Sequence, residues 1–102
     1  MKLETPASQL DALGNPVRRR LYRALAQAGH KGLAVGQLQQ RLGMPASTLS
    51  HHLKRLVEPG LMRQERRGNS LVCYAENAAM TGLVAFLTEE CSIDEGVGGA
   101  SE

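Results

Sequence analysis

The fold of this 102-residue chain is decided by residues 43–60, which have the sequence GMPASTLSHHLKRLVEPG. Gly43 favours the end of one helix and Pro45 the start of the next, so residues 35–56 are predicted to form a helix, a tight turn and a second helix. The second helix carries three leucines on one face at helical spacing, Leu49, Leu53 and Leu56. Its other faces carry hydrogen-bonding and basic side chains, from Ser47, Thr48, Ser50, His51, Lys54 and Arg55. One side of this helix therefore suits a core, and the other suits a polar partner.

Two more helices are predicted before this segment. Residues 5–13 form a short helix, and the pair Asn15 and Pro16 begins another that continues to Ala28. Its inward face is predicted to be Val17, Leu21, Ala24, Leu25 and Ala28, and its outward face Arg18, Arg19, Arg20 and Arg23. A third helix of about two turns is expected to start near Val35 and to end before Gly43.

A hairpin and a last helix are predicted after it. The pair Gly68-Asn69 is a strong turn signal, and the strands on either side are residues 61–67 and 70–75. Asn77 is predicted to cap a helix that reaches about Cys91.

The length of the chain allows one domain with one core. We assign that domain to residues 1–91, and we expect residues 92–102 to be a disordered tail because they contain few apolar side chains. The predicted fold is mostly α, with five helices and a two-stranded hairpin.

Basic residues are concentrated in the middle of the chain. Residues 16–67 contain eleven of the twelve lysines and arginines and two of the ten acidic residues, so their formal charge is +9 against −7 for the rest. A basic block over a helix-turn-helix pattern indicates a polyanion, and double-stranded DNA fits best. A domain of this shape used only for protein contacts is the alternative, and it would bind with little dependence on salt.

Three motifs make the chain resemble the ArsR/SmtB family of bacterial winged helix-turn-helix repressors. They are Asn15-Pro16-x-Arg18, Ser50-x-His52-Leu53 and the Gly60-Leu61 step into the hairpin, and the resemblance covers about residues 6–91. It implies a homodimer formed by the first and last helices, an inverted-repeat operator, and release of the operator when a ligand binds. The interface residues expected on this basis are Leu10, Leu13, Met80, Leu83, Val84 and Leu87. The apolar stripe over residues 80–87 is consistent with that role.

The resemblance makes residues 46–57 the recognition helix and the hairpin its wing. Base edges and nearby phosphates are expected to be contacted by Ser47, Thr48, Ser50 and His51, and phosphates by Lys54 and Arg55. Arg63, Arg66 and Arg67 flank the wing tip and are expected to enter a minor groove. His52 is expected to be partly buried and hydrogen-bonded. Ala46 stands where the family usually has glutamine. Alanine can touch only a thymine methyl group, so the family's typical base preference is not carried over to this step.

Cysteine chemistry offers a hypothesis for the effector. Zinc sensing at the family's known sites is disfavoured, because the helix before the turn has no cysteine and the last helix has no histidine. Cys73 and Cys91 remain, and the sequence leaves open whether they converge within a subunit, between subunits or not at all.

If they converge, two soft thiolates suit trivalent arsenic, and a monomethyl arsenical has two exchangeable oxygens that two thiols would replace. A thiol pair in the wing and the last helix also looks like the organoarsenical-responsive subset of the family, and Ser92 stands where three-cysteine relatives have another cysteine. A disulfide switch between the same residues and a reading with no thiol role are the alternatives.

Other function classes lack the residues that they need. Ser50, His51 and His52 diverge on one helix with no acid nearby to orient a base, so the chain is not expected to be an enzyme or to require a cofactor. The sequence has no run of 18 apolar residues and no apolar segment of a signal peptide. We therefore expect a cytoplasmic protein with no membrane partner.

Overall fold

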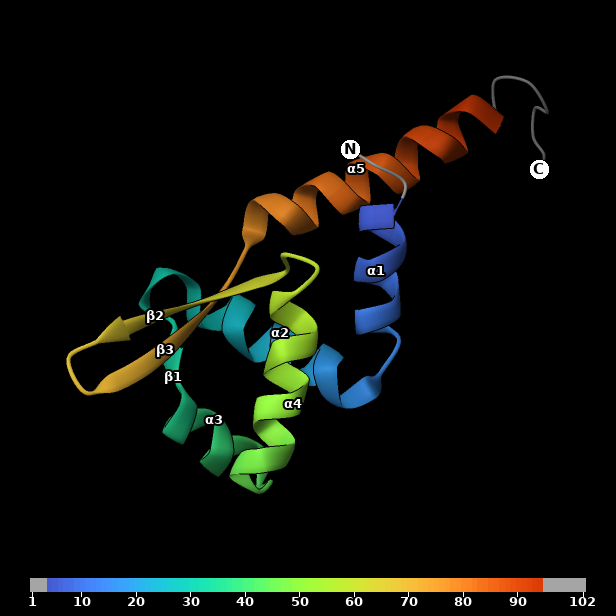
Figure 1. Ribbon diagram of the computed structural model, residues 1–102. Helices are drawn as coiled ribbons and strands as arrows, with labels where there is room; N and C mark the ends of the chain where they lie inside the picture. Colours follow the sequence, from blue (N-terminus) through green and yellow to red (C-terminus); the bar gives the residue numbers. More distant parts are fainter. Residues whose placement is uncertain (1–3, 95–102) are drawn as a thin grey trace.

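The computed structural model describes residues 4–94, with the side chains of residues 5–89 (Figure 1). The described residues form five α-helices: α1 (Glu4–Leu13), α2 (Pro16–Ala28), α3 (Val35–Leu42), α4 (Ala46–Val57) and α5 (Asn77–Asp94). A short 3-10 helix, η1 (Gly29–Lys31), follows α2, and the strands are β1 (Leu33–Ala34), β2 (Met62–Arg67) and β3 (Ser70–Ala75). The predicted helices and the predicted hairpin are confirmed.

Local capping explains where α2 begins and where α3 ends. The side-chain oxygen of Asn15 accepts hydrogen bonds from the backbone N–H groups of Val17 and Arg18, at 2.9 and 3.1 Å, so α2 starts at Pro16. Gly43 has a φ of +61° and donates its N–H to the carbonyl oxygen of Gln39, which closes α3. The turn from α3 to α4 is therefore set by its own residues.

The wing belongs to a three-stranded antiparallel sheet with the order β1-β3-β2. The two residues of β1 pair with Cys73 and Val72 of β3, and this strand was not predicted because two residues carry no periodic pattern. Along the hairpin, Arg63 lies opposite Tyr74 and Arg67 lies opposite Ser70. The predicted two-stranded wing is thus extended by a strand at its base.

The core lies between α2, α4 and the base of the sheet. Leu49, Leu53 and Leu56 of α4 are buried as their spacing predicted. They pack in one cluster with residues of α2, α3, β3 and the turn before β2, including Leu21, Leu25, Leu38, Leu61 and Cys73. Burial of this leucine-rich face holds α4 on the domain and leaves its polar side outward.

Helix α5 runs from the end of β3 across α1 and continues past it (Figure 1). Asn77 is its first residue, and the carbonyl oxygen of Glu76 accepts from the N–H groups of Ala79 and Met80. The prediction that Asn77 is the cap is therefore wrong by one position. The helix also passes Cys91 and ends at Asp94, so the first residues of the expected tail are helical and the rest lie outside the described range.

The apolar stripe of α5 divides between two environments. Leu83 is 2% exposed and is buried within its own chain, and Met80 packs against the core. Val84 and Leu87 are 54% and 40% exposed, and Leu10 of α1 is 44% exposed, whereas Leu13 packs inward. The uncovered apolar face is thus formed by Leu10, Val84 and Leu87, and Leu83 does not belong to it.

Candidate nucleic-acid interface

The outward side of α4 forms a polar ridge. Ser47, His51 and Lys54 are exposed and are spaced so that they follow one another along the helix surface, opposite the three buried leucines. Ser50 lies on the flank of this ridge that faces the wing, and Thr48 lies on the other flank, and both are exposed. All four residues that were predicted to contact bases are therefore available to a partner.

The N-terminus of α4 adds backbone donors to the ridge. Its capping position is held by Pro45, which makes no side-chain cap. The N–H groups of the first turn, which have no partner within a helix, are left for a ligand or water. This end of a helix also carries partial positive charge, which favours a phosphate.

The wing carries an ordered group of charged side chains on one face. Alternation along β2 puts Arg63, Glu65 and Arg67 on the same side of the sheet as Tyr74. Glu65 accepts from Arg63 at 3.0 Å and from Arg67 at 3.2 Å. The guanidinium of Arg63 lies 4.4 Å from the centre of the Tyr74 ring. Sequence reasoning missed the roles of Glu65 and Tyr74, although the period-2 spacing of three charged residues was a usable signal.

Arg63 does not flank the wing tip, which corrects its predicted placement. It lies at the base of β2, where it pairs with Glu76 at 3.3 Å as well as with Glu65. Glu65, followed by Glu76, raises the pKa of Arg63 above its ordinary value. Arg66 and Arg67 are exposed beside the turn at Gly68-Asn69. The tip therefore carries two arginines.

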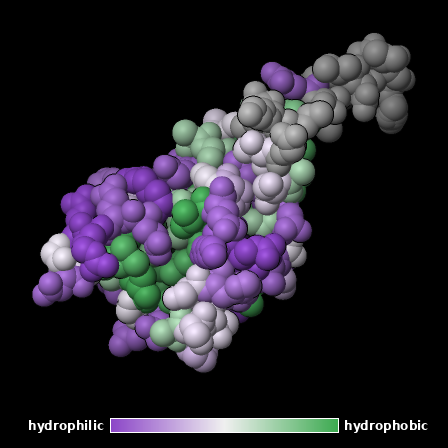
Figure 2. All heavy atoms as spheres, viewed as in Figure 1, coloured by the Kyte–Doolittle hydropathy of each residue, from purple (hydrophilic) through white to green (hydrophobic). Residues whose placement is uncertain are grey.

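A hollow of about 260 Å³ separates the wing from α4. Figure 2 shows hydrophobic residues between the hydrophilic surfaces of the wing and α4. The hollow has an apolar floor and a polar rim, and its lining residues are Val35, Leu53, Val57 and Leu71 with Ser50, Lys54 and Gln64. Ser50 and Lys54 of α4 thus face Gln64 and Leu71 of the wing across one hollow.

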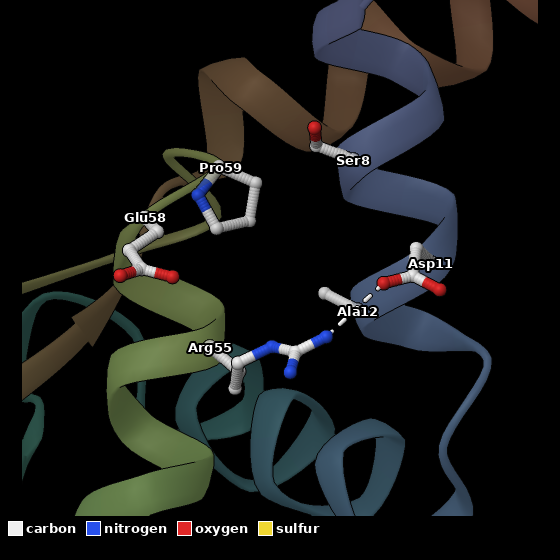
Figure 3. Close-up of a pocket in the computed structure, with 6 residues that line it drawn as sticks. All are labelled: Ser8, Asp11, Ala12, Arg55, Glu58 and Pro59. Carbon is white, nitrogen blue, oxygen red and sulfur yellow. Dashed lines mark hydrogen bonds and ion pairs between the residues drawn. The ribbon is translucent and has the colours of Figure 1, made fainter.

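Arg55 turns away from that surface. It reaches across a pocket of about 290 Å³ between α4 and α1 and pairs with Asp11 at 3.2 Å (Figure 3). Ser8 and Glu58 line the same pocket. The phosphate contact predicted for Arg55 would require this ion pair to open, whereas Lys54 is already on the ridge.

Arg18 and His52 meet beneath the recognition helix. Arg18 was predicted to face outward, but it is 8% exposed, and its Nε donates to the carbonyl oxygen of Ala12 at 2.8 Å. Its Nη1 lies 3.4 Å from Nδ1 of His52. His52 is half-buried, as expected, and burial together with the positive charges of Arg18 and His51 lowers its pKa.

The positions of Cys73 and Cys91 restrict the hypothesis that their thiols bind one effector. Cys73 is fully buried in β3, and burial raises the pKa of its thiol, partly offset by a hydrogen bond from Gln64. Cys91 lies within α5, about 21 Å along the helix from Asn77. Figure 1 shows β3 leading into α5 without doubling back. Because a disulfide needs Cα atoms within about 7 Å, Cys73 and Cys91 of one chain do not meet in this conformation.

Two other absences hold over the part of the chain that the structure describes. It contains no group of three or more histidine, cysteine, aspartate or glutamate side chains arranged to bind a metal ion. None of its helices has the length and apolar character needed to span a membrane.

Comparison with known proteins places these features in a family. A family model described as a helix-turn-helix domain matches residues 13–65. The HTH-type transcriptional regulator YgaV of Escherichia coli is 30% identical over 84 residues, which cover 82% of this chain and 83% of YgaV. The transcriptional repressor PagR of Bacillus anthracis is 30% identical over 87 residues, which cover 85% of both chains.

Solved structures have the same fold. An ArsR-like transcriptional regulator from Rhodococcus has a TM-score of 0.80 at 21% identity, over 94% of this chain and 89% of that one. A homodimeric winged helix-turn-helix DNA-binding domain from Mycobacterium bovis has a TM-score of 0.68 at 25% identity, over 98% of this chain and 88% of that one. The chain therefore belongs to the ArsR/SmtB family of winged helix-turn-helix transcriptional regulators.

Proposed function

We propose that this regulator is a homodimeric repressor that binds an inverted-repeat operator through α4 and the wing and releases it when an effector binds. The observation that carries the proposal is an exposed ridge, Ser47, His51 and Lys54, beside a wing whose tip carries two exposed arginines. Lys54 of the ridge and Gln64 and Leu71 of the wing line the hollow between them. A helix of this size enters the major groove, and arginines at a wing tip fit the adjacent minor groove. Positive charge on both the ridge and the wing supplies the phosphate contacts that give affinity.

The proposed dimer interface is the apolar face of Leu10, Val84 and Leu87. These side chains are exposed in the single chain, and α1 and α5 are the helices that carry them. The homodimeric state of the Mycobacterium bovis domain supports the formation of a dimer. Two-fold symmetry of the protein would then be matched by an inverted repeat in the DNA.

Selection of duplexes from random DNA tests the operator. The wild-type protein is expected to enrich an inverted repeat whose half-sites lie about one helical turn apart. Lys54→Ala is then expected to weaken binding of the selected duplex about tenfold, and Arg55→Ala to weaken it less because Arg55 is held by Asp11. Failure to enrich any sequence, with no affinity for DNA, would favour a role in protein contacts alone.

We propose a trivalent arsenical as the effector only if it is bound by one cysteine from each protomer. Since Cys73 and Cys91 of one chain do not meet, the second thiol at an arsenic atom must come from the partner protomer. The disulfide alternative has the same requirement. Burial and a raised pKa also make Cys73 a slow nucleophile until the sheet opens, so a conformational change would accompany the reaction.

A release assay separates these effectors. Reduced protein on its selected duplex would be titrated with methylarsenite, arsenite, zinc and an oxidant, alongside Cys73→Ser and Cys91→Ser. Release by methylarsenite that either substitution abolishes supports the arsenical. Release by oxidant alone supports a disulfide, and retention of DNA under all four treatments rules out both thiol proposals.

A further inference from the structure

One buried side chain links the helix of the proposed dimer interface to the recognition helix. Arg18, in the first turn of α2, donates through Nε to the carbonyl oxygen of Ala12, in the last turn of α1. Through Nη1 it reaches Nδ1 of His52, in the middle of α4. The distances are 2.8 and 3.4 Å, and the guanidinium is almost fully shielded from water.

The contact joins two of the motifs that mark the family resemblance. Arg18 ends the Asn15-Pro16-x-Arg18 motif, and His52 lies in the Ser50-x-His52-Leu53 motif, 34 residues away. Asn15 caps the first turn of α2 and so fixes the direction in which Arg18 leaves the helix. The residues of the two motifs therefore build one contact.

Chemistry fixes the direction of the hydrogen bond. A guanidinium has donors and no acceptor, so Nδ1 of His52 must be the acceptor and the imidazole must be neutral with its proton on Nε2. Burial and the neighbouring positive charges favour that neutral form. The contact thus requires one protonation state of His52.

We propose that Arg18 is a positioning residue for DNA recognition, which sets the orientation of α4 relative to α1 by bridging Ala12 and His52. This inference rests on the proposed function. Apolar packing of the α4 leucines is not directional, whereas the rigid fork of an arginine is. Among the described residues, α1 has two other side-chain links in this direction. Arg55 with Asp11 is largely exposed and therefore weak, and buried Gln9 donates to the carbonyl oxygen of Pro59, which lies beyond the end of α4.

A matched pair of arginines provides the test. Arg19 is exposed and also donates to the end of α1, to the carbonyl oxygen of Leu13 at 2.9 Å, but no bond from it to α4 occurs among the described residues. Binding of the selected duplex would be measured for Arg18→Met and Arg19→Met at a temperature where circular dichroism shows each variant folded. We expect Arg18→Met to lose about tenfold or more in affinity and Arg19→Met to lose less than about threefold.

A double-mutant cycle covers the case in which Arg18→Met does not fold. His52→Ala leaves the bond from Arg18 to Ala12 in place, and His52→Gln restores an acceptor. We expect His52→Ala to weaken binding, His52→Gln to recover most of it, and His52→Ala combined with Arg18→Lys to cost no more than the larger single loss.

The outcomes distinguish this inference from the proposed function. If the wild type binds the duplex and the Arg18 and His52 variants bind it with the same affinity, the inference is overturned and the proposed function stays intact. Additive losses in the cycle would also overturn it, since they would mean that the two residues act separately. Absence of DNA binding by the wild type would overturn both.

Discussion

Of the glycines whose surroundings the structure describes, Gly32, directly before β1, is the one at which an added Cβ would lie within 3 Å of its neighbours. Its φ is +66°, and a Cβ there would lie 2.6 Å from the carbonyl oxygen of Cys73 and 2.7 Å from the Tyr74 ring. Gly29 has nearly the same φ, +64°, but open space around it. We expect Gly29→Ala to cost about 1–3 kcal/mol through backbone strain and Gly32→Ala to cost about 1–3 kcal/mol more. Urea denaturation measures both, and equal losses would contradict the close contact.

The lowered pKa of His52 predicts that the folded protein loses stability at acidic pH. Burial, then the charges of Arg18 and His51, lower its pKa in the folded state, whereas an unfolded histidine titrates near about 6.5. Its contribution to stability is therefore complete above about pH 6.5 and is lost as the pH falls through the lowered value. Among the elements packed against α4, Asp11 pairs with Arg55, and Glu65 pairs with Arg63 and Arg67. Arg19, Arg20 and Arg23 of α2 and Arg66 of β2 form no ion pair among the described residues, but arginines stay charged throughout this pH range.

Urea unfolding over a pH series tests this assignment. His52→Gln, which cannot be protonated, is expected to lose part of the decrease in unfolding free energy below about pH 6.5. His30→Gln, in the exposed η1 turn, is the matched control. If the unfolding free energy of His52→Gln fell below about pH 6.5 by as much as that of the wild type, the assignment would be contradicted.

Single residues were predictable from the sequence where their partners are local. Asn15 and Gly43 act within one turn of themselves, and both were identified correctly. Arg18 was wrongly predicted to face solvent because its partner His52 is 34 residues away, and charge alone favours exposure. Val84 and Leu83 are neighbours of similar hydropathy, so only packing separates the covered residue from the uncovered one.

At the scale of elements, the wing is tied more firmly at its base than at its tip. Arg63 is held at the base by Glu65, Glu76 and the face of Tyr74. Arg67 makes one exposed ion pair, with Glu65, and Arg66 makes none among the described residues. We expect Arg66→Ala or Arg67→Ala to reduce the slope of log affinity against log salt by about 1, because each removes one phosphate contact. Arg63→Ala is expected to change that slope less.

Fluorescence anisotropy with the selected duplex measures these slopes. An effect of Arg63→Ala as large as that of Arg67→Ala would mean that the base of the wing, too, lies on DNA. The elements themselves were largely predictable, since Asn15 caps α2, Gly43 ends α3 and the hairpin has its own turn. β1 was missed because its pairing with β3 is its only signal.

At the scale of the whole molecule, the single chain leaves apolar side chains of α1 and α5 exposed to water. Val84→Glu with Leu87→Glu is expected to give a folded monomer by light scattering, because these side chains are exposed in the single chain. Leu83→Glu is instead expected to unfold the chain, since it places a charge in a buried position. A stable dimer of the double variant would contradict the proposed interface.

The salt dependence of affinity tests whether the ridge of α4 and the wing bind the phosphate backbone and bases of DNA. It would be measured for the wild-type protein with its selected duplex over a series of salt concentrations. Log affinity is expected to fall linearly with log salt, with a slope of about −0.9 for each phosphate contacted. An affinity that does not change with salt would contradict it.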